Sequence, residues 1–134
     1  MKSTKKVSFY LVDDSSEFRE AMKLFVEQEL RGRVIGEAGD GIDALEDKKI
    51  FEADIILMDI RMKMLDGPEA TKGLLNKKRS LIIVAISNGF FEFPIDVLIA
   101  QGFKGFVQKS KAFDELPKAI KAIKEGNYYS SKAL

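Results

Sequence analysis

Three carboxylates come directly after apolar segments of the sequence. Asp13 and Asp14 follow the apolar residues 7–12, and Asp59 follows a second apolar segment at residues 54–58. Clustered carboxylates raise each other's pKa unless a counter-charge neutralises them. The counter-charge that suits an all-oxygen site is Mg²⁺, which binds carboxylates, a backbone carbonyl and waters. If the three acids meet in the folded chain, they predict a magnesium site.

A hydroxyl and an ammonium group stand at corresponding places later in the chain. Ser87 follows the apolar residues 81–86, and Lys109 comes shortly after the apolar residues 103–107. Around a bound metal, a lysine neutralises phosphoryl oxygens, a hydroxyl donates a hydrogen bond to them, and a carboxylate such as Asp59 attacks in line. This combination predicts phosphoryl transfer to the Asp59 side chain.

Each of these residues also has an ordinary structural role open to it. Asp14 and Glu17 have the spacing of a helix capping box, and Asp59 could be a turn residue. Ser87 could cap the next helix, and Lys109 could be a surface charge. A cap explains one of two adjacent acids but not both. We favour the functional interpretation because all the positions together fit one site.

The segments that precede these residues have the composition of buried strands. Five apolar runs are predicted to be strands, at residues 7–12, 34–38, 54–58, 81–86 and 103–107. Apolar residues with helical spacing predict helices between and after them, at residues 17–30, 42–47, 68–76, 94–101 and 113–125. The resulting (βα)5 order predicts an α/β fold, with a parallel sheet covered on both faces.

Strand order decides which strand ends become neighbours. In open parallel sheets, function collects at the carboxyl ends of the strands, near the point where the strand order switches. We predict a flavodoxin-like doubly wound sheet of order 2-1-3-4-5, formed by one domain over residues 1–134. In this order the first and third strands are adjacent, so Asp13 and Asp14 face Asp59 across a crevice.

The composition excludes several other kinds of chemistry. The chain has 134 residues, 46% hydrophobic and 32% charged, with no Cys and no His. Thiol nucleophiles, Cys/His zinc sites and histidine general bases are therefore excluded. No apolar run approaches the roughly 20 residues of a membrane span, and none resembles a secretory signal. We expect a soluble, cytoplasmic protein with no membrane partner.

Positive charge is concentrated in the last part of the chain. The whole sequence has 22 Lys and Arg against 21 Asp and Glu, but residues 101–134 carry seven Lys and three acids. Lys118, Lys121 and Lys124 alternate with apolar residues at helical spacing, which is typical of a solvated helix face. We expect no direct nucleic-acid binding, because neither Arg nor aromatic residues accompany these lysines.

Taken together, the motifs resemble the receiver domain of bacterial two-component response regulators over nearly the whole chain. The resemblance implies that Asp59 accepts a phosphoryl group from a sensor histidine kinase, so the chain is a phosphoacceptor and not an enzyme. The residues that carry it are Asp13-Asp14, Asp59-Ile-Arg-Met, Asp66-Gly67, Ser87 and Lys109.

The same resemblance implies a set of metal ligands. Asp14, Asp59 and the backbone carbonyl of Arg61 would bind Mg²⁺, and Asp13 would hold it through water. One departure lies close to these residues: Lys63 stands where the family usually has Pro after Met62. It removes no ligand.

The resemblance also implies a conformational switch. Ser87 and Lys109 would contact the phosphoryl group, and Phe106 would turn inward when Ser87 is drawn toward it. We expect the readout on the face of the fourth helix, fifth strand and fifth helix, next to an apolar cluster after Ser87. The cluster consists of Phe90, Phe91, Phe93 and Pro94. Two further departures from the family pattern are Asn88 for a small residue and Ser110 for Pro.

The last part of the chain, at residues 102–109 and 119–130, is similar to receivers of the NarL/FixJ type. Such receivers usually continue into a helix-turn-helix domain, so we interpret the chain as a truncated regulator of transcription. It would touch DNA only through a domain that it lacks, and it would form a homodimer on phosphorylation.

Two other functions are alternatives. A haloacid-dehalogenase-like phosphatase also uses an aspartate nucleophile after a strand, but it normally has a second Asp two residues on, where this chain has Arg61. A stand-alone, phospho-regulated protein-binding module would use the same acidic cluster. A flavin-binding module is disfavoured, because Asp13 and Asp14 would repel a ligand phosphate.

Overall fold

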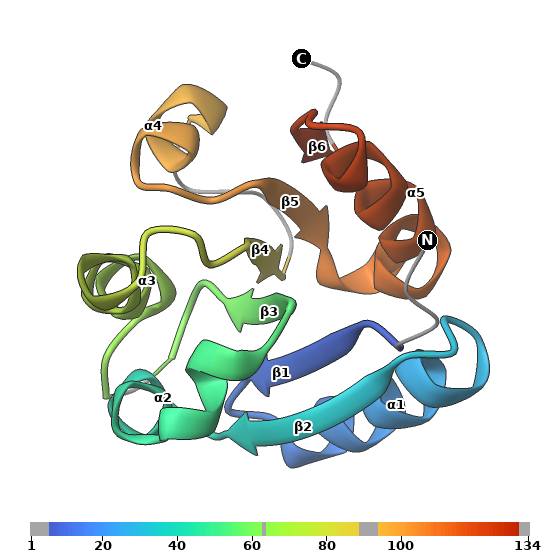
Figure 1. Ribbon diagram of the computed structural model, residues 1–134, viewed down its shortest axis with the longest axis horizontal. Coiled ribbons are helices and arrows are strands. Elements are labelled where there is room, and N and C mark those ends of the chain that lie inside the picture. Colours follow the sequence, from blue (N-terminus) through green and yellow to red (C-terminus); the bar gives the residue numbers. More distant parts are fainter. Residues whose placement is uncertain (1–5, 63, 89–93, 132–134) are drawn as a thin grey trace.

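A parallel six-stranded sheet forms the centre of the computed structural model, which describes residues 6–62, 64–88 and 94–131 (Figure 1). The strands are β1 (Ser8–Val12), β2 (Arg33–Ala38), β3 (Ile55–Asp59), β4 (Ile83–Ser87), β5 (Gly105–Gln108) and β6 (Tyr129–Ser130). Their order is β2-β1-β3-β4-β5-β6, and every neighbouring pair is parallel. The predicted order of the first five strands is confirmed.

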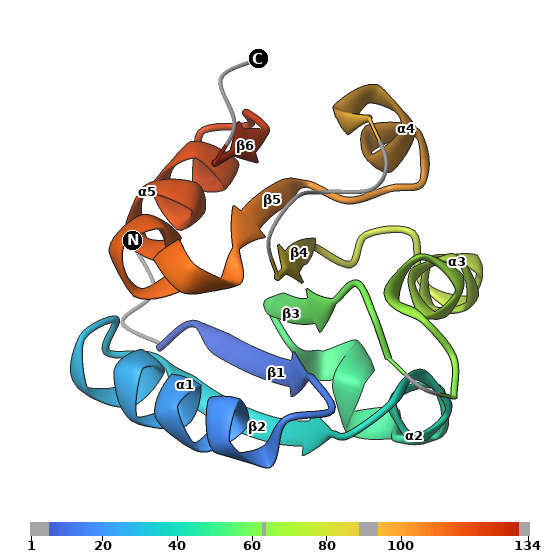
Figure 2. The same ribbon diagram turned by 180° about the vertical axis from the view of Figure 1, so that it is seen from behind.

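Five α-helices cover both faces of the sheet in the part of the chain described above. Helices α1 and α5 lie on one face, and α2, α3 and α4 lie on the other (Figures 1 and 2). The α-helices are α1 (Ser16–Gln28), α2 (Gly41–Glu46), α3 (Gly67–Lys77), α4 (Ile95–Ala100) and α5 (Ala112–Lys124). Two 3₁₀ turns, η1 (Lys48–Glu52) and η2 (Lys109–Lys111), were not predicted as helical elements.

The core is split into two halves because side chains of a strand alternate between the two faces of the sheet. On the side of α1 and α5, the buried strand residues are Phe9, Leu11, Ile55, Leu57, Val84, Ile86 and Val107. On the other side, they include Tyr10, Val12, Ile56, Met58, Ile83, Ala85 and Phe106. Burial on both faces explains why these strands are continuously apolar in sequence.

The sixth strand is a feature that the periodicity did not predict. Tyr129 pairs with Gly105, and the backbone N–H of Ser131 donates to the carbonyl of Phe106 at 2.9 Å. The Tyr129 hydroxyl donates to Glu115 on α5 at 2.7 Å. A two-residue strand carries no alternation that sequence analysis could detect, so its place depends on these tertiary contacts.

Two features of the backbone bear on the sequence analysis. Among the helices of the described ranges, none is long and apolar enough to cross a membrane. The peptide bond before Ser110, which stands where the family pattern has Pro, is trans, and no peptide bond in the described ranges is cis.

Candidate functional site

The acidic residues leave the sheet side by side at the carboxyl ends of β1 and β3. The register of these two strands pairs Val12 with Met58, and Asp13 and Asp59 follow them directly. Asp13, Asp14 and Asp59 each offer a carboxylate oxygen, and these oxygens lie within 4.8 Å of one another. The sequence expectation that Asp13 and Asp14 face Asp59 is therefore met by the geometry.

Burial distinguishes the three carboxylates. Asp13 and Asp59 are 3% and 6% exposed, whereas Asp14 is exposed to solvent. The cluster thus has two carboxylates inside the protein and one at its mouth. A cation or a phosphoryl donor can approach it from the side of Asp14.

The hydroxyl and the lysine continue the same edge of the sheet. Asp59 pairs with Ile86 across β3 and β4, and Ser87 is the next residue. Ser87 pairs in turn with Gln108 across β4 and β5, and Lys109 follows. Each strand end is thus the neighbour of the next.

Lys109 is the cation that neutralises this cluster. Its Nζ atom lies 2.8 Å from Oδ2 of Asp13 and 3.8 Å from Oδ2 of Asp59. The side chain is only 12% exposed. The alternative that Lys109 is an ordinary surface charge is therefore wrong, because the start of η2 turns it into the acidic cluster.

Asp59 has strongly perturbed electrostatics. Burial, followed by the negative charge of Asp13, raises the pKa of Asp59 to about 7, although Lys109 and a backbone hydrogen bond oppose the rise. That hydrogen bond is donated by the N–H of Arg61 to Oδ1 of Asp59 at 3.3 Å. This hydrogen bond makes Asp59 a turn residue as well, as the alternative interpretation of the sequence proposed. Because ionising Asp59 is costly, a further positive charge near its carboxylate would be stabilised.

The loop after β1 differs from the capping box that the sequence offered as an alternative. Helix α1 is capped by Ser15, whose Oγ accepts a hydrogen bond from the N–H of Phe18 at 3.1 Å. Oδ1 of Asp13 accepts from the N–H of Ser15 at 2.8 Å. The Asp14–Glu17 capping box is therefore wrong, because the helix begins one residue later. Asp14 remains exposed at the mouth of the cluster.

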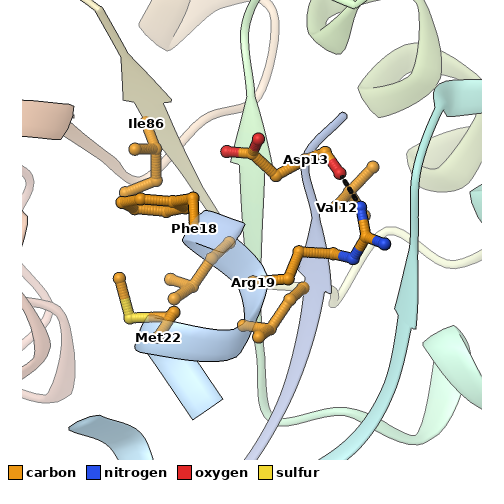
Figure 3. A pocket seen from close by; sticks show the side chains of 8 residues that line it. Val12, Asp13, Phe18, Arg19, Met22 and Ile86 are labelled. Carbon is orange, nitrogen blue, oxygen red and sulfur yellow. Dashed lines mark hydrogen bonds between the residues drawn. The ribbon is translucent and has the colours of Figure 1, made fainter. Parts of the chain in front are cut away.

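Arg19 is a structural member of the site that sequence reasoning missed. Its Nη1 donates to the backbone carbonyl of Asp13 at 2.5 Å, as Figure 3 shows, and its Nε donates to Glu37 at 2.7 Å. Glu37 also forms an ion pair with Lys23, and hydrogen bonds from Lys23 and Arg19 lower the pKa of Glu37. The network ties the loop that carries Asp13 to β2. No sequence signal reveals this network, because Arg19 lies on α1 and Glu37 lies on β2, 18 residues later in the chain.

Ser87 does not cap the next helix. Helix α4 begins after Pro94 without a side-chain cap, and the Ser87 hydroxyl lies 3.4 Å from the carbonyl of Asn88. Ser87 is 6% exposed. The capping alternative is therefore wrong, and the hydroxyl stays at the strand end beside the cluster.

Phe106 lies wholly inside the core. Its ring is 0% exposed and packs edge-to-face with Phe103, with 6.2 Å between ring centroids and 63° between ring planes. That Phe106 turns inward when Ser87 is drawn toward a phosphoryl group stays a prediction. Phe90, Phe91 and Phe93 of the predicted apolar cluster, and Lys63, lie outside the described residues, while Pro94 is exposed.

The donor set fits Mg²⁺. Three carboxylates offer hard oxygen ligands, and a cation beside them would favour the ionised form of Asp59, whose pKa is raised first by burial and then by the charge of Asp13. Arg61 lies in the turn after Asp59, which is where a backbone carbonyl ligand was expected. Thiolate and imidazole ligands, which softer metals prefer, are absent because the sequence has no Cys and no His.

Comparison with known proteins identifies relatives over most of the chain. Residues 9–121 match the family model of the response regulator receiver domain. The transcriptional regulatory protein DegU of Brevibacillus brevis is 29% identical over 124 residues, covering 92% of this chain and 52% of DegU. The nitrate/nitrite response regulator NarL of Escherichia coli (strain K12) is 27% identical over 134 residues, covering 100% and 62%. The chain thus spans about half the length of such regulators.

Solved structures agree with the fold. The signal receiver domain of the response regulator NarL from Mycobacterium tuberculosis superposes with a TM-score of 0.79 at 28% identity. The match covers 92% of this chain and 99% of that one. The similarity therefore extends over essentially the whole of an isolated domain.

Proposed function

The chain belongs to the response regulator receiver domain family, of the NarL type, and from this premise we propose that Asp59 accepts a phosphoryl group in a magnesium-dependent reaction. One observation carries the proposal. The carboxylate of Asp59 is buried beside Asp13 and Asp14, with the ammonium group of Lys109 at 3.8 Å. The donor would be the phosphohistidine of a sensor kinase.

We assign the metal ligands from the way in which each carboxylate is engaged. Oδ1 of Asp13 accepts from Ser15, and its Oδ2 is paired with Lys109, which supports a contact through water. Asp14 and Asp59 would bind directly, together with the carbonyl of Arg61. When bound, Mg²⁺ would supply the positive charge that neutralises the phosphoryl oxygens.

The side chains divide the chemical work. The ionised Asp59 attacks phosphorus, so that the new P–O bond forms as the P–N bond to the donor histidine breaks. A protonated carboxyl cannot attack, and the positive charge of Lys109 favours the ionised form. Lys109 and the Ser87 hydroxyl would then contact the transferred oxygens. In this reaction the protein itself becomes phosphorylated and does not convert a substrate repeatedly, so we propose a signalling module and not an enzyme.

A haloacid-dehalogenase-like phosphatase is a weaker proposal. It would need a second carboxylate two residues after Asp59, and Arg61 stands there with its backbone turned into the Asp59 loop. A general acid from another element would have to replace it. The described cluster offers Asp13 and Asp14, but both lie on the loop proposed for the metal.

We propose that the output is the regulation of transcription. DegU is a transcriptional regulatory protein and NarL is a nitrate/nitrite response regulator. Both are longer than the part that this chain matches. Any DNA contact would come from such an additional segment. A stand-alone module that binds a protein on phosphorylation is the second candidate.

We place the readout on α4, β5 and α5, with a change in self-association to a homodimer. Ser87 of β4 pairs with Gln108 of β5, which lies two residues after Phe106, and β6 is hydrogen-bonded to the backbone of Phe106. A shift of Ser87 toward a phosphoryl group would therefore displace β5. Beryllofluoride should perturb the amide signals of α4 and β5 more than those of α2, and should change the mass measured by sedimentation. Equal perturbation with no change in mass would contradict this assignment.

Acetyl phosphate provides the test of the phosphoacceptor assignment. With Mg²⁺ it should transfer one acid-stable, base-labile phosphoryl group to the protein. Asp59→Asn or EDTA should abolish the labelling, whereas Asp40→Asn, which alters the half-buried cap of α2, should leave it intact. Labelling that survives Asp59→Asn would show that another residue is the acceptor.

A further inference from the structure

Lys109 has an aromatic neighbour that the phosphotransfer chemistry leaves unexplained. Its Nζ atom lies 4.5 Å from the centroid of the Phe18 ring. Phe18 belongs to the first turn of α1 and packs against the core on the same side of the sheet as Met22 and Val26. A cation over an aromatic face is attracted by the ring quadrupole, most strongly where water is excluded. Lys109 is only 12% exposed.

The contact closes a ring of four interactions around Asp13. Oδ1 of Asp13 accepts from the N–H of Ser15, and Oγ of Ser15 accepts from the N–H of Phe18. The Phe18 ring contacts Lys109, and Lys109 returns to Oδ2 of Asp13. The same carboxylate therefore orients both the start of α1 and the ammonium group.

The Phe18 ring is itself held in place from behind. It packs against Phe113 of α5 with 6.2 Å between the ring centroids, and Phe113 packs edge-to-face with Phe25 at 5.0 Å. Figure 3 shows Phe18 next to Ile86, in a small pocket that Asp13 also lines. Because Phe113 and Ile86 support the ring directly, it offers a fixed surface to the flexible lysine.

We propose that Phe18 is a positioning residue, which holds the Lys109 ammonium group where the phosphoryl oxygens arrive. This inference rests on the proposed function of Asp59. Lysine has four rotatable bonds, and a side chain already fixed in a reactive geometry loses less entropy when the transition state forms. Phe18 would thus speed phosphorylation without touching the reacting atoms.

The competing explanation is that Phe18 only packs α1 against α5. A leucine keeps an apolar side chain at this position but has no ring face, whereas a tyrosine keeps the face. The control is Phe25→Leu, because Phe25 contacts Phe113 in the same aromatic cluster and has no place in the proposed machinery.

The test measures the rate of Mg²⁺-dependent labelling by acetyl phosphate. Phe18→Leu should slow labelling about three- to tenfold, as expected for loss of a partly buried cation–π contact. Phe18→Tyr should restore the rate, and Phe25→Leu should not reduce it. Equal rates in wild type and Phe18→Leu, or equal slowing in Phe18→Tyr, would overturn the inference. If Phe18→Leu fails to fold, Phe18→Met takes its place.

A second measurement separates this inference from the proposed function. The NMR signals of the Lys109 ε-CH₂ protons should be shifted upfield by the Phe18 ring, and the shift should disappear in Phe18→Leu but persist in Phe18→Tyr. Absence of the shift in the wild type would refute the contact. A wild-type protein that shows the shift but takes up no label would instead refute the phosphoacceptor assignment.

Discussion

Replacing Asp59 by asparagine should stabilise the metal-free protein at alkaline pH. Asn has the same shape as Asp, and its Oδ1 can still accept the hydrogen bond from the N–H of Arg61. The substitution removes a negative charge that is buried beside Asp13. The structure thus predicts that the proposed phosphoacceptor is a source of instability in the unmodified, metal-free state.

The size of the effect follows from the pKa of Asp59. The rise from 3.8 to about 7 in the folded state corresponds to about 4 kcal/mol of lost stability above pH 7, at 1.36 kcal/mol per pKa unit. This figure already includes the attraction of Lys109, which lowers the pKa of Asp59, so we expect Asp59→Asn to gain about 4 kcal/mol at pH 8. For a domain of this size that raises Tm by roughly 14 °C.

The sign of the pH dependence is set by the raised pKa. Between about pH 4 and pH 7 the folded wild type holds a proton on Asp59 that the unfolded chain has lost. The stability of the wild type therefore falls as the pH rises from about 4 to about 7 and levels off above it, and Asp59→Asn lacks this fall. Urea denaturation in EDTA should show a difference between the two proteins of about 1.6 kcal/mol at pH 5 and the full difference at pH 8.

Two controls accompany this measurement. Asp40→Asn replaces the carboxylate that caps α2 by another good cap and should change stability by less than about 0.5 kcal/mol at either pH. Mg²⁺ should stabilise the wild type more than Asp59→Asn, which narrows the difference at pH 8. An Asp59→Asn variant that is less stable than the wild type at pH 8, or equally altered at both pH values, would refute the electrostatic reasoning.

Three further substitutions test other parts of the structure. Lys109→Gln leaves two buried carboxylates without their cation, so urea denaturation at pH 8 should show a loss of about 2 kcal/mol or more; an unchanged midpoint would mean that the pair contributes nothing. Tyr10→Phe removes a 2.7 Å hydrogen bond to Asp47 and should lower the free energy of unfolding by about 1 kcal/mol, and a gain in stability would contradict it. Gly67→Ala places a Cβ atom against the carbonyl of Asp59 and should cost about 2 kcal/mol or more in thermal unfolding followed by circular dichroism; a variant as stable as the wild type would show that α3 can move away.

The arrangement of the main strands and helices was predictable because it depends on periodicity. Strands buried on both faces must be apolar throughout, and the helices between them must have one apolar stripe, so the (βα)5 order can be read from the chain. Parallel strands also place all their carboxyl ends at one edge. That rule brings Asp13, Asp59, Ser87 and Lys109 to the same side of the sheet once their strands are recognised.

What the sequence could not specify were contacts between residues far apart in the chain. The cap of α1 falls on Ser15 rather than Asp14, in a loop where Asp13 accepts from the N–H of Ser15 and is itself held by the distant Lys109. Strand β6 is too short to have a pattern of its own and exists through its bonds to β5.

The electrostatic character of the site also depends on the tertiary structure. The raised pKa of Asp59 requires its burial beside Asp13, and the anchoring of Arg19 requires Glu37 on β2. The aromatic face beneath Lys109 requires that α1 and α5 pack on the same side of the sheet. Residue types and spacing thus determine which chemical groups reach the sheet edge. Their charge states and orientations are decided by packing, because burial and distance set the energies of charges and are properties of the folded chain alone.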